Sequence, residues 1–181
     1  MGNLLKLLLI AMALLNFPSA AAAQTPTDSI GQLNFMLGEW QGKGWILGRD
    51  KQKRFFFQSE TIQSKVNNRA LMIDGLGYRI DSVGTVTDEV IHEAFGVISY
   101  NTERAAITML AFSKLRGRME ADFTILEGKK VHWSFEEANG AVIRFTDDFS
   151  VPDQWKEVGE VSVNGKDWYP FFEMVLYRKK T

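Results

Sequence analysis

The sequence contains no cysteine and only two histidines among its 181 residues. The missing cysteines exclude disulfides, thiolate catalysis, metal sites built on Cys and lipid attachment through a Cys. A chain of this kind must be stabilised by its hydrophobic core alone. The two histidines, His92 and His132, would need carboxylate partners to hold a metal, and Glu93 points away from His92 in an extended strand. We therefore predict no metal site.

Long hydrophobic runs are also absent, apart from one near the start. Leu7–Leu15 is apolar but much shorter than the roughly 20 residues of a membrane-spanning helix. Lys6 is the only charged residue before Asp28, and small residues precede Gln24. This pattern is typical of a signal peptide, with a retained membrane anchor as the alternative. We predict a signal peptide over residues 1–23 and an exported protein, periplasmic or secreted, with no membrane span once that leader is removed.

An excess of positive charge is missing as well. Without Lys6, the mature chain has 20 basic and 22 acidic side chains, a net charge near −2. Nucleic-acid binding normally requires a basic face, so a nucleic-acid partner is not expected. The sequence gives no indication of the oligomeric state.

Short β-type runs dominate the chain after residue 37. Residues 24–37 are expected to form an arm and a short helix, capped by Asp28 or Ser29 and continuing through Met36. Residues 38–181 form the predicted barrel domain, in which turn signals such as Asn139-Gly140 and Asn164-Gly165 separate the runs. The ten predicted strands are Glu39–Leu47, Arg54–Lys65, Ala70–Ile80, Glu89–Tyr100, Ala105–Ser113, Arg118–Leu126, Lys130–Glu136, Ala141–Phe149, Gln154–Val163 and Trp168–Arg178.

The short connections between these runs predict how the strands pair. Each strand is expected to lie antiparallel to its sequence neighbour, and an open sheet of this width would expose two edges and tend to curl. Closing the meander removes the edges. We therefore predict an all-β fold, a closed up-and-down antiparallel barrel of about ten strands. A two-layer sandwich is the alternative, but it usually needs longer crossover connections.

The first predicted strand carries a family resemblance. Gly38, Trp40, Gly42 and Gly44 follow a short apolar segment, and this Gly-x-Trp-x-Gly-x-Gly pattern resembles the start of calycin-like barrels. It is most similar to the nitrobindin family and to related bacterial lipocalin-like families of unassigned function. The resemblance implies a ten-stranded barrel that holds a ligand.

Two features depart from the nitrobindin pattern. Trp45-Ile46-Leu47 follows Gly44, where nitrobindins continue with a further glycine and a Tyr-Pro pair. Nitrobindins also bind haem iron through a histidine near the last strands, and this chain has no His after His132. We therefore predict no cofactor. Haem is the one cofactor that the resemblance suggests.

Several polar and aromatic residues are candidates for contacting a ligand inside such a barrel. Glu60 is flanked by apolar and aromatic residues, and Glu173 lies in an aromatic final strand. A buried acid needs a partner, because an unpaired buried charge is costly, and Arg79 or Arg144 is a candidate for that partner. The alternative for each residue is a place on the rim or outer surface, and for Trp40 a place in the barrel floor. The predicted ligand-binding residues are Trp40, Glu60, Arg79, His92, His132, Arg144 and Glu173.

The predicted function follows from the barrel and from its aromatic content. Five Trp and thirteen Phe are enough to build a dense core or to line a pocket. The chain lacks a Gly-x-Ser-x-Gly turn, so a hydrolase is not expected. We predict an exported, non-catalytic barrel that binds a small apolar or amphipathic ligand. The alternatives are an isomerase, cyclase or haem-redox enzyme in the same barrel, or a structural domain with a filled core.

Overall fold

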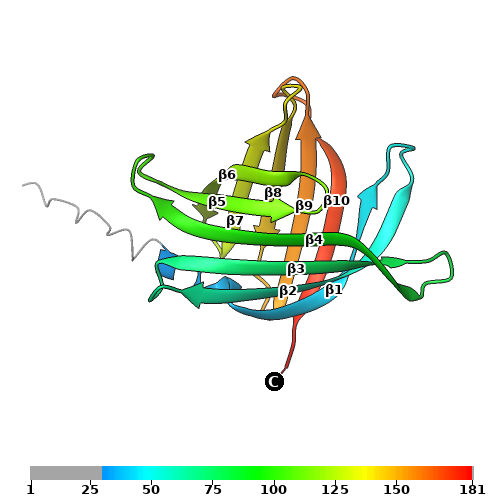
Figure 1. The fold of residues 1–181 in the computed structure, drawn as a ribbon, viewed down its shortest axis with the longest axis horizontal. Helices are drawn as coiled ribbons and strands as arrows, with labels where there is room; N and C mark the ends of the chain where they lie inside the picture. Colours follow the sequence, from blue (N-terminus) through cyan, green and yellow to red (C-terminus); the bar gives the residue numbers. More distant parts are fainter. Residues whose placement is uncertain (1–29, 181) are drawn as a thin grey trace, which may run out of the picture.

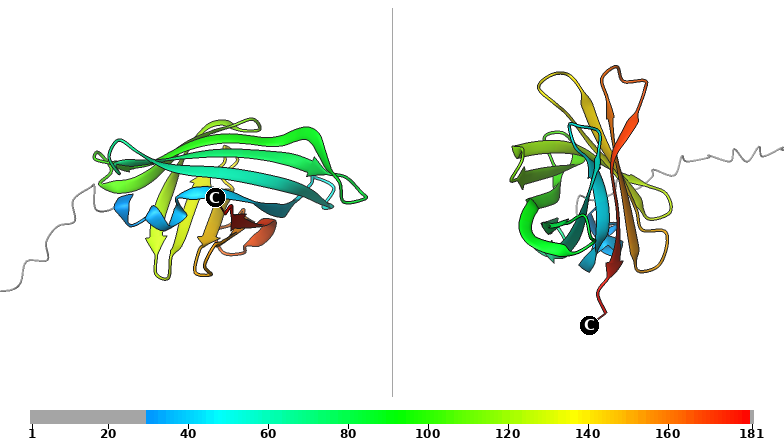
Figure 2. Two further views of the ribbon diagram at one scale, coloured as in Figure 1. Left: turned by 90° about the horizontal axis from the view of Figure 1, so that it is seen from below. Right: turned by 90° about the vertical axis from the view of Figure 1, so that its right-hand side faces the viewer.

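The computed structural model describes residues 30–180, which form a single antiparallel barrel. Figure 1 shows β2–β5 running across the view while β7–β10 run up it, and Figure 2 shows these two walls lying one over the other. The ten strands are β1 (Gly38–Leu47), β2 (Lys53–Lys65), β3 (Ala70–Ile80), β4 (Val86–Asn101), β5 (Ala106–Ser113), β6 (Gly117–Leu126), β7 (Lys130–Glu136), β8 (Val142–Asp148), β9 (Gln154–Ser162) and β10 (Tyr169–Arg178).

The barrel is closed by pairing of its first and last strands. Each strand pairs with its sequence neighbours, and β1 pairs with both β2 and β10. In the closing pair, Trp40 lies opposite Arg178 and Gly44 lies opposite Met174. The predicted closed up-and-down barrel of ten strands is therefore confirmed.

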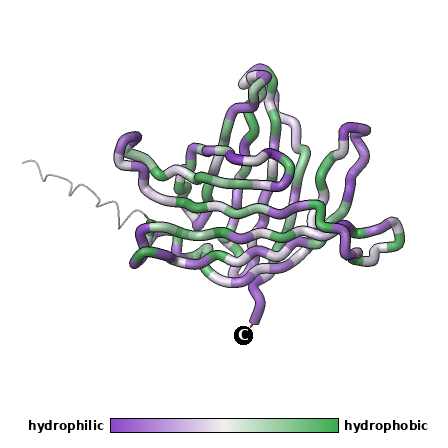
Figure 3. Tube along the Cα trace, in the orientation of Figure 1, coloured by the Kyte–Doolittle hydropathy of each residue, from purple (hydrophilic) through white to green (hydrophobic). Residues whose placement is uncertain are grey.

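Alternation along each strand separates an inner face from an outer face. In β8, Ile143 and Asp147 are buried, whereas Arg144 and Thr146 between them are only half-buried. Polar and apolar residues alternate along much of the chain in Figure 3, and the connecting loops are mainly hydrophilic. This period of two is expected for strands that have one face on a core and one in water.

The predicted N-terminal helix is confirmed only in part. Within the described residues, Ile30 and Gly31 are helical, Gln32 and Leu33 form a turn, and a 3₁₀ helix, η1, covers Asn34–Met36. Leu37 already has extended backbone angles, φ −57° and ψ 142°, and leads directly into β1. The helical segment therefore ends at Met36, the predicted end, and β1 begins at Gly38. The predicted capping residues, Asp28 and Ser29, lie outside the described residues, as does the predicted signal peptide.

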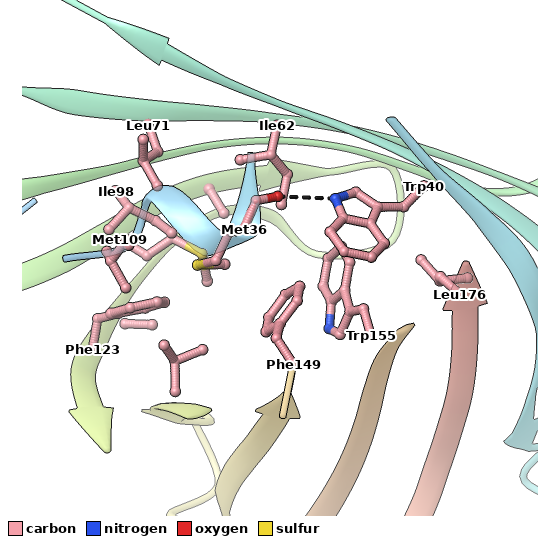
Figure 4. Packing of buried hydrophobic residues seen from close by; sticks show 14 of the residues in the cluster. Met36, Trp40, Ile62, Leu71, Ile98, Met109, Phe123, Phe149, Trp155 and Leu176 are labelled. Carbon is pink, nitrogen blue, oxygen red and sulfur yellow. Dashed lines mark hydrogen bonds between the residues drawn. The ribbon is translucent and has the colours of Figure 1, made fainter. Parts of the chain in front are cut away.

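One end of the barrel is closed by a cluster of large side chains, which we call the floor. The indole Nε1 of Trp40 donates a hydrogen bond to the Met36 carbonyl, with a donor–acceptor distance of 2.9 Å (Figure 4). The Trp40 ring packs edge-on against Phe149 and Trp155, with centroids 5.4 and 6.1 Å apart. Leu33 is fully buried in the same core cluster. The segment before β1 therefore plugs this end.

Arg178, the last residue of β10, ties the floor together. Its guanidinium donates hydrogen bonds to the carbonyl oxygens of Phe35 and Leu37, and it lies 4.0 Å from the Trp40 ring centroid. Its Nε also contacts Asp153, at 3.0 Å. The opposite end of the barrel, the mouth, carries the loops that follow β1, β3, β5, β7 and β9.

No helix within residues 30–180 has the length and apolar character needed to cross a membrane.

Candidate functional site

Three acidic side chains from three strands are buried inside the barrel. Glu60 of β2, Asp147 of β8 and Glu157 of β9 are 8%, 2% and 6% exposed. Asp147 and Glu157 lie directly opposite each other in the β8–β9 ladder, so their side chains leave the same face at neighbouring positions. The charges of Asp147 and Glu60 both raise the pKa of Glu157, which indicates that the three groups are close together. We call them the carboxyl cluster.

Glu60 has one satisfied and one unsatisfied carboxylate oxygen. Gln58 donates from Nε2 to Glu60 Oε1 at 2.8 Å, whereas Glu60 Oε2 is buried without a hydrogen-bond partner. Burial raises the pKa of Glu60 to about 8, and repulsion from Asp147 and Asp74 adds to this shift. Because its pKa lies near 8, Glu60 is largely protonated at neutral pH.

Asp147 and Glu157 differ in the hydrogen bonds that they accept. Trp155 donates from Nε1 to Asp147 Oδ1 at 3.2 Å, and Trp133 is a second indole donor to this carboxyl. Burial raises the pKa of both acids, and the indole donors oppose the rise at Asp147. Glu157 instead has two acidic neighbours that raise its pKa further.

An aromatic layer lies next to the carboxyl cluster on the side of the mouth. The rings of Trp133 and Phe145 stack with centroids 4.0 Å apart, and Phe145 meets Phe172 edge-on at 5.7 Å. Phe172 in turn stacks on Phe56 at 5.6 Å. In sequence, Phe145 comes two residues before Asp147 on β8 and therefore lies on the same inner face, one step nearer the mouth. We call these four rings the aromatic wall.

Three rings of the aromatic wall remain partly accessible. Phe56 is buried, but Trp133, Phe145 and Phe172 are only half-buried although they are on inner-facing positions. The barrel wall is continuous and the floor is plugged, so water reaches these rings from the mouth. From the mouth inward, the aromatic wall therefore comes before the carboxyl cluster.

The floor has shallow pockets of its own. One pocket, of about 210 Å³, is lined by Phe35, Trp40, Phe149 and Arg178 among others. A second, of about 400 Å³, lies beside Asp153, Arg178 and the two lysines that follow it. Both are at the end of the barrel away from the aromatic wall.

The carboxyl cluster does not form a metal centre. Within residues 30–180, no group of three or more His, Asp or Glu side chains has the geometry to hold a metal ion. The aromatic surroundings and the protonated state of Glu60 also differ from the open, ionised oxygen sites that hard cations prefer.

Some of the predicted ligand-binding residues lie in or beside the interior. Glu60 belongs to the carboxyl cluster, and Trp40 lies opposite it in the β1–β2 ladder but forms part of the floor. His92 faces Gly77 across the β3–β4 ladder, and a side chain at Gly77 would collide with both His92 and Gln58. His92 is therefore near Glu60 through Gln58, and burial lowers its pKa.

The other predicted residues are not brought to this site. Arg144 forms an ion pair with Glu160 at 2.8 Å and covers the Trp168 ring, on the outer face of the barrel. His132 alternates with the inner residues Val131 and Trp133, so it lies on the same outer face. Two further predicted residues are partly exposed and form ion pairs, Arg79 with Glu89 and Glu173 with Lys156. The expected pairing of a buried acid with Arg79 or Arg144 does not occur.

Sequence reasoning did not select Asp147, Glu157 or Gln58 as site residues. A signal for the two acids was present, because each is in phase with the apolar residues of its own strand. Asp147 follows Ile143 and Phe145 at spacings of two, and Glu157 follows Trp155. An acid in the apolar phase of a strand indicates an inward carboxyl. The sequence alone does not show that acids from β2, β8 and β9 meet.

Comparison with known proteins gives similarity in structure only. No protein-family model matches the chain, and no curated protein sequence matches it significantly. Rv2717c from M. tuberculosis is similar over 87% of this chain and 100% of its own, with a TM-score of 0.60 and 11% identity. The S-type phycobiliprotein lyase CPES from Guillardia theta is similar over 84% of this chain and 93% of its own, with a TM-score of 0.57 and 12% identity.

A third solved structure is a DUF3598-family protein of unknown function from Nostoc punctiforme. It gives a TM-score of 0.50 and 12% identity over 82% of this chain and 49% of its own. At these identities the similarity concerns the fold and not the activity. The chain therefore has the fold of a calycin-like ten-stranded barrel.

Proposed function

We propose that this protein binds a small, largely apolar molecule inside its barrel and does not transform it. The observation that carries this proposal is the half-accessible aromatic wall, in which Trp133, Phe145 and Phe172 face inward yet remain reachable from the mouth. Apolar rings supply binding free energy, and a few polar groups beneath them fix the orientation of the ligand. The carboxyl cluster supplies those polar groups.

The test uses N-phenyl-1-naphthylamine, a neutral aromatic probe whose fluorescence rises in apolar surroundings. We expect saturable binding of one probe per chain. Replacing Trp133 by Ala removes a stacked ring and should weaken binding about tenfold or more, because aromatic contacts contribute roughly 0.5–1.5 kcal/mol beyond the area that they bury. Trp168→Ala is the matched control, since Trp168 packs under Arg144 on the outer face.

Two outcomes would contradict the proposal. Absence of saturable binding, with nothing extracted by organic solvent from the purified protein, would favour a structural domain with a filled core. Equal weakening by Trp133→Ala and Trp168→Ala would place the probe outside the barrel.

We also propose that the protein is exported and loses residues 1–23. The support is the sequence pattern alone, an apolar run with a single charge followed by small residues. Expression of the full chain in a bacterium, followed by mass spectrometry of the purified protein, tests this. We expect a mature N-terminus within residues 20–24, and recovery of a chain that retains Met1 would contradict export.

A further inference from the structure

Within residues 30–180, no positively charged side chain forms a salt bridge with the acids of the carboxyl cluster. Every salt bridge within residues 30–180 uses other acids, and most of those pairs are partly exposed on the outside or at the barrel ends. Burying acids without a cation is costly, and such groups respond by keeping their protons. Stability alone does not explain three unpaired acids in one interior.

One carboxylate oxygen of Glu60 is buried without a hydrogen-bond partner. Glu60 Oε2 is buried and unpartnered, while Oε1 is held by Gln58. The carboxyl group also rests directly on the backbone of Gly75, where an added Cβ would lie 2.6 Å from both carboxylate oxygens. The absence of a side chain at Gly75 thus gives this carboxyl its position, in which Oε2 is buried and has no partner.

The charges around Glu60 favour a positive ligand group. Asp147 inside the barrel and the exposed Asp74 both act on Glu60 by repulsion, and Glu60 and Asp147 act on Glu157. His92 is the titratable base beside Gln58, and burial disfavours its charged form. An anionic head group would add to this repulsion. A cationic head group would relieve the repulsion between the carboxyl groups. It would also meet the ring faces of the aromatic wall, which attract cations.

We propose that the carboxyl cluster is a subsite for positive charge and that the ligand is an organic cation, an ammonium, amidinium or guanidinium group on an aromatic body. Glu60 Oε2 accepts a hydrogen bond from the cationic head. Asp147, held by its two indole donors, supplies the opposing negative charge. This inference rests on the proposed function, because the aromatic body would occupy the aromatic wall.

The experiment compares three probes that share a naphthalene ring and differ in the head group. They are 2-naphthylmethylamine, 2-naphthylmethanol and the carboxylate anion of 2-naphthylacetic acid. Affinities are measured by calorimetry at pH 8, where the amine is charged. We expect the amine to bind at least about tenfold more tightly than the alcohol, and the carboxylate to bind more weakly than the alcohol. Glu60→Gln should abolish the preference for the amine over the alcohol. Glu173→Gln changes an acid on the outer face and is the control. It should alter neither the affinity for the amine nor the affinity for the alcohol.

A pH series on the unaltered protein gives a second measurement that does not depend on folding of a variant. Amine affinity should increase from pH 6 to pH 8, since the cation binds best to ionised carboxyls, while the affinity for the alcohol stays constant. If the alcohol binds and the amine shows no preference, the cation subsite is overturned and the proposed function stands. If none of the three probes binds, both proposals fail.

Discussion

Single residues inside this barrel are placed where stability alone would not place them. A buried acid with an unpartnered oxygen lowers the free energy of unfolding. Replacing such groups by uncharged ones is often neutral or stabilising. Glu60 combines burial with only one hydrogen-bond donor, Gln58. If this acid serves a ligand, the ligand-free protein should be less stable than a variant that lacks it.

Glu60→Gln should change how stability depends on pH. Burial raises the pKa of Glu60 from 4.5 to about 8, so the folded state binds the proton more tightly than the unfolded state. The stabilisation from this proton is complete below pH 4.5 and is lost as pH rises through 8. The free energy of unfolding of Glu60→Gln relative to the unaltered protein should therefore increase between pH 5 and pH 9.

The increase should exceed about 1.4 kcal/mol, the value of one pKa unit. Chemical denaturation at several pH values measures it. His92 and His132, whose pKa values are lowered by burial, reduce stability below pH 6.5 in both proteins and cancel in the difference. Glu160→Gln, on the outer face, is the control. A difference between Glu60→Gln and the unaltered protein that is constant from pH 5 to 9 would show that Glu60 is solvated.

At the scale of elements, closure depends on the close approach of β1 and β10. A Cβ at Gly42 would lie 2.1 Å from the carbonyl oxygen of Val175 and 2.9 Å from the Cα of Leu176, both backbone atoms. The backbone of β10 has little freedom to move there, since β9 holds its other side. Gly42 is therefore required for the close crossing of these two strands.

Gly42→Ala should destabilise the protein by about 3 kcal/mol, at the upper end of the usual cost of overpacking, because the obstacle is backbone. Thermal denaturation followed by circular dichroism measures the change. Gly31→Ala is the matched control, as nothing lies within 4 Å of an added Cβ at Gly31. Equal stability of the two variants would show that β10 does not approach β1 as closely as described.

The elements were largely predictable from the sequence, and the reasons are local. Asn-Gly turns and the alternation of apolar and polar residues located the strands. The bounds of β4 were predicted least well, because this strand begins at Val86 and not at Glu89. Asp88 is a residue type depleted in strands, and the ladder between β3 and β4 is irregular between Gly77 and Ile80. The end of the N-terminal helix at Met36 was also predicted, whereas its last turn is 3₁₀ instead of α-helical.

The site was predictable only in part. Glu60 was a candidate because of its apolar flanks, and the structure places it inside. The inward or outward direction of Arg144, His132 and Glu173 depended on which face of each strand is buried, and an aromatic-rich strand leaves that choice open. Proximity of Glu60 to Asp147 and Glu157 arises from curvature of the whole sheet, which no single strand encodes.

At the scale of the whole molecule, Arg178 joins the two ends of the described chain. It contacts the segment before β1 through Phe35 and Leu37, the loop before β9 through Asp153, and the face of Trp40. Three separate parts of the floor thus depend on one guanidinium group. Hydrogen bonds that involve a charged group contribute more to stability than neutral ones, roughly 1.5–3 kcal/mol.

Arg178→Leu should therefore destabilise the protein by about 2–4 kcal/mol and expose the floor. Hydrogen exchange should show faster exchange at the Trp40 indole and at residues 33–37, with little change in β4–β6. Arg54→Leu is the control, because Arg54 forms an exposed ion pair with Asp50. Uniform acceleration in all strands would mean that Arg178 supports the barrel as a whole and not its floor.

The closed strand order has a consequence for assembly. Within the described chain every strand of the sheet has a neighbour on both sides, so no row of free amide and carbonyl groups is available for another polypeptide to extend. Recognition by a second protein would have to rely on side chains. Linear addition of copies, the route by which many β proteins form fibrils, would first require that β1 and β10 separate.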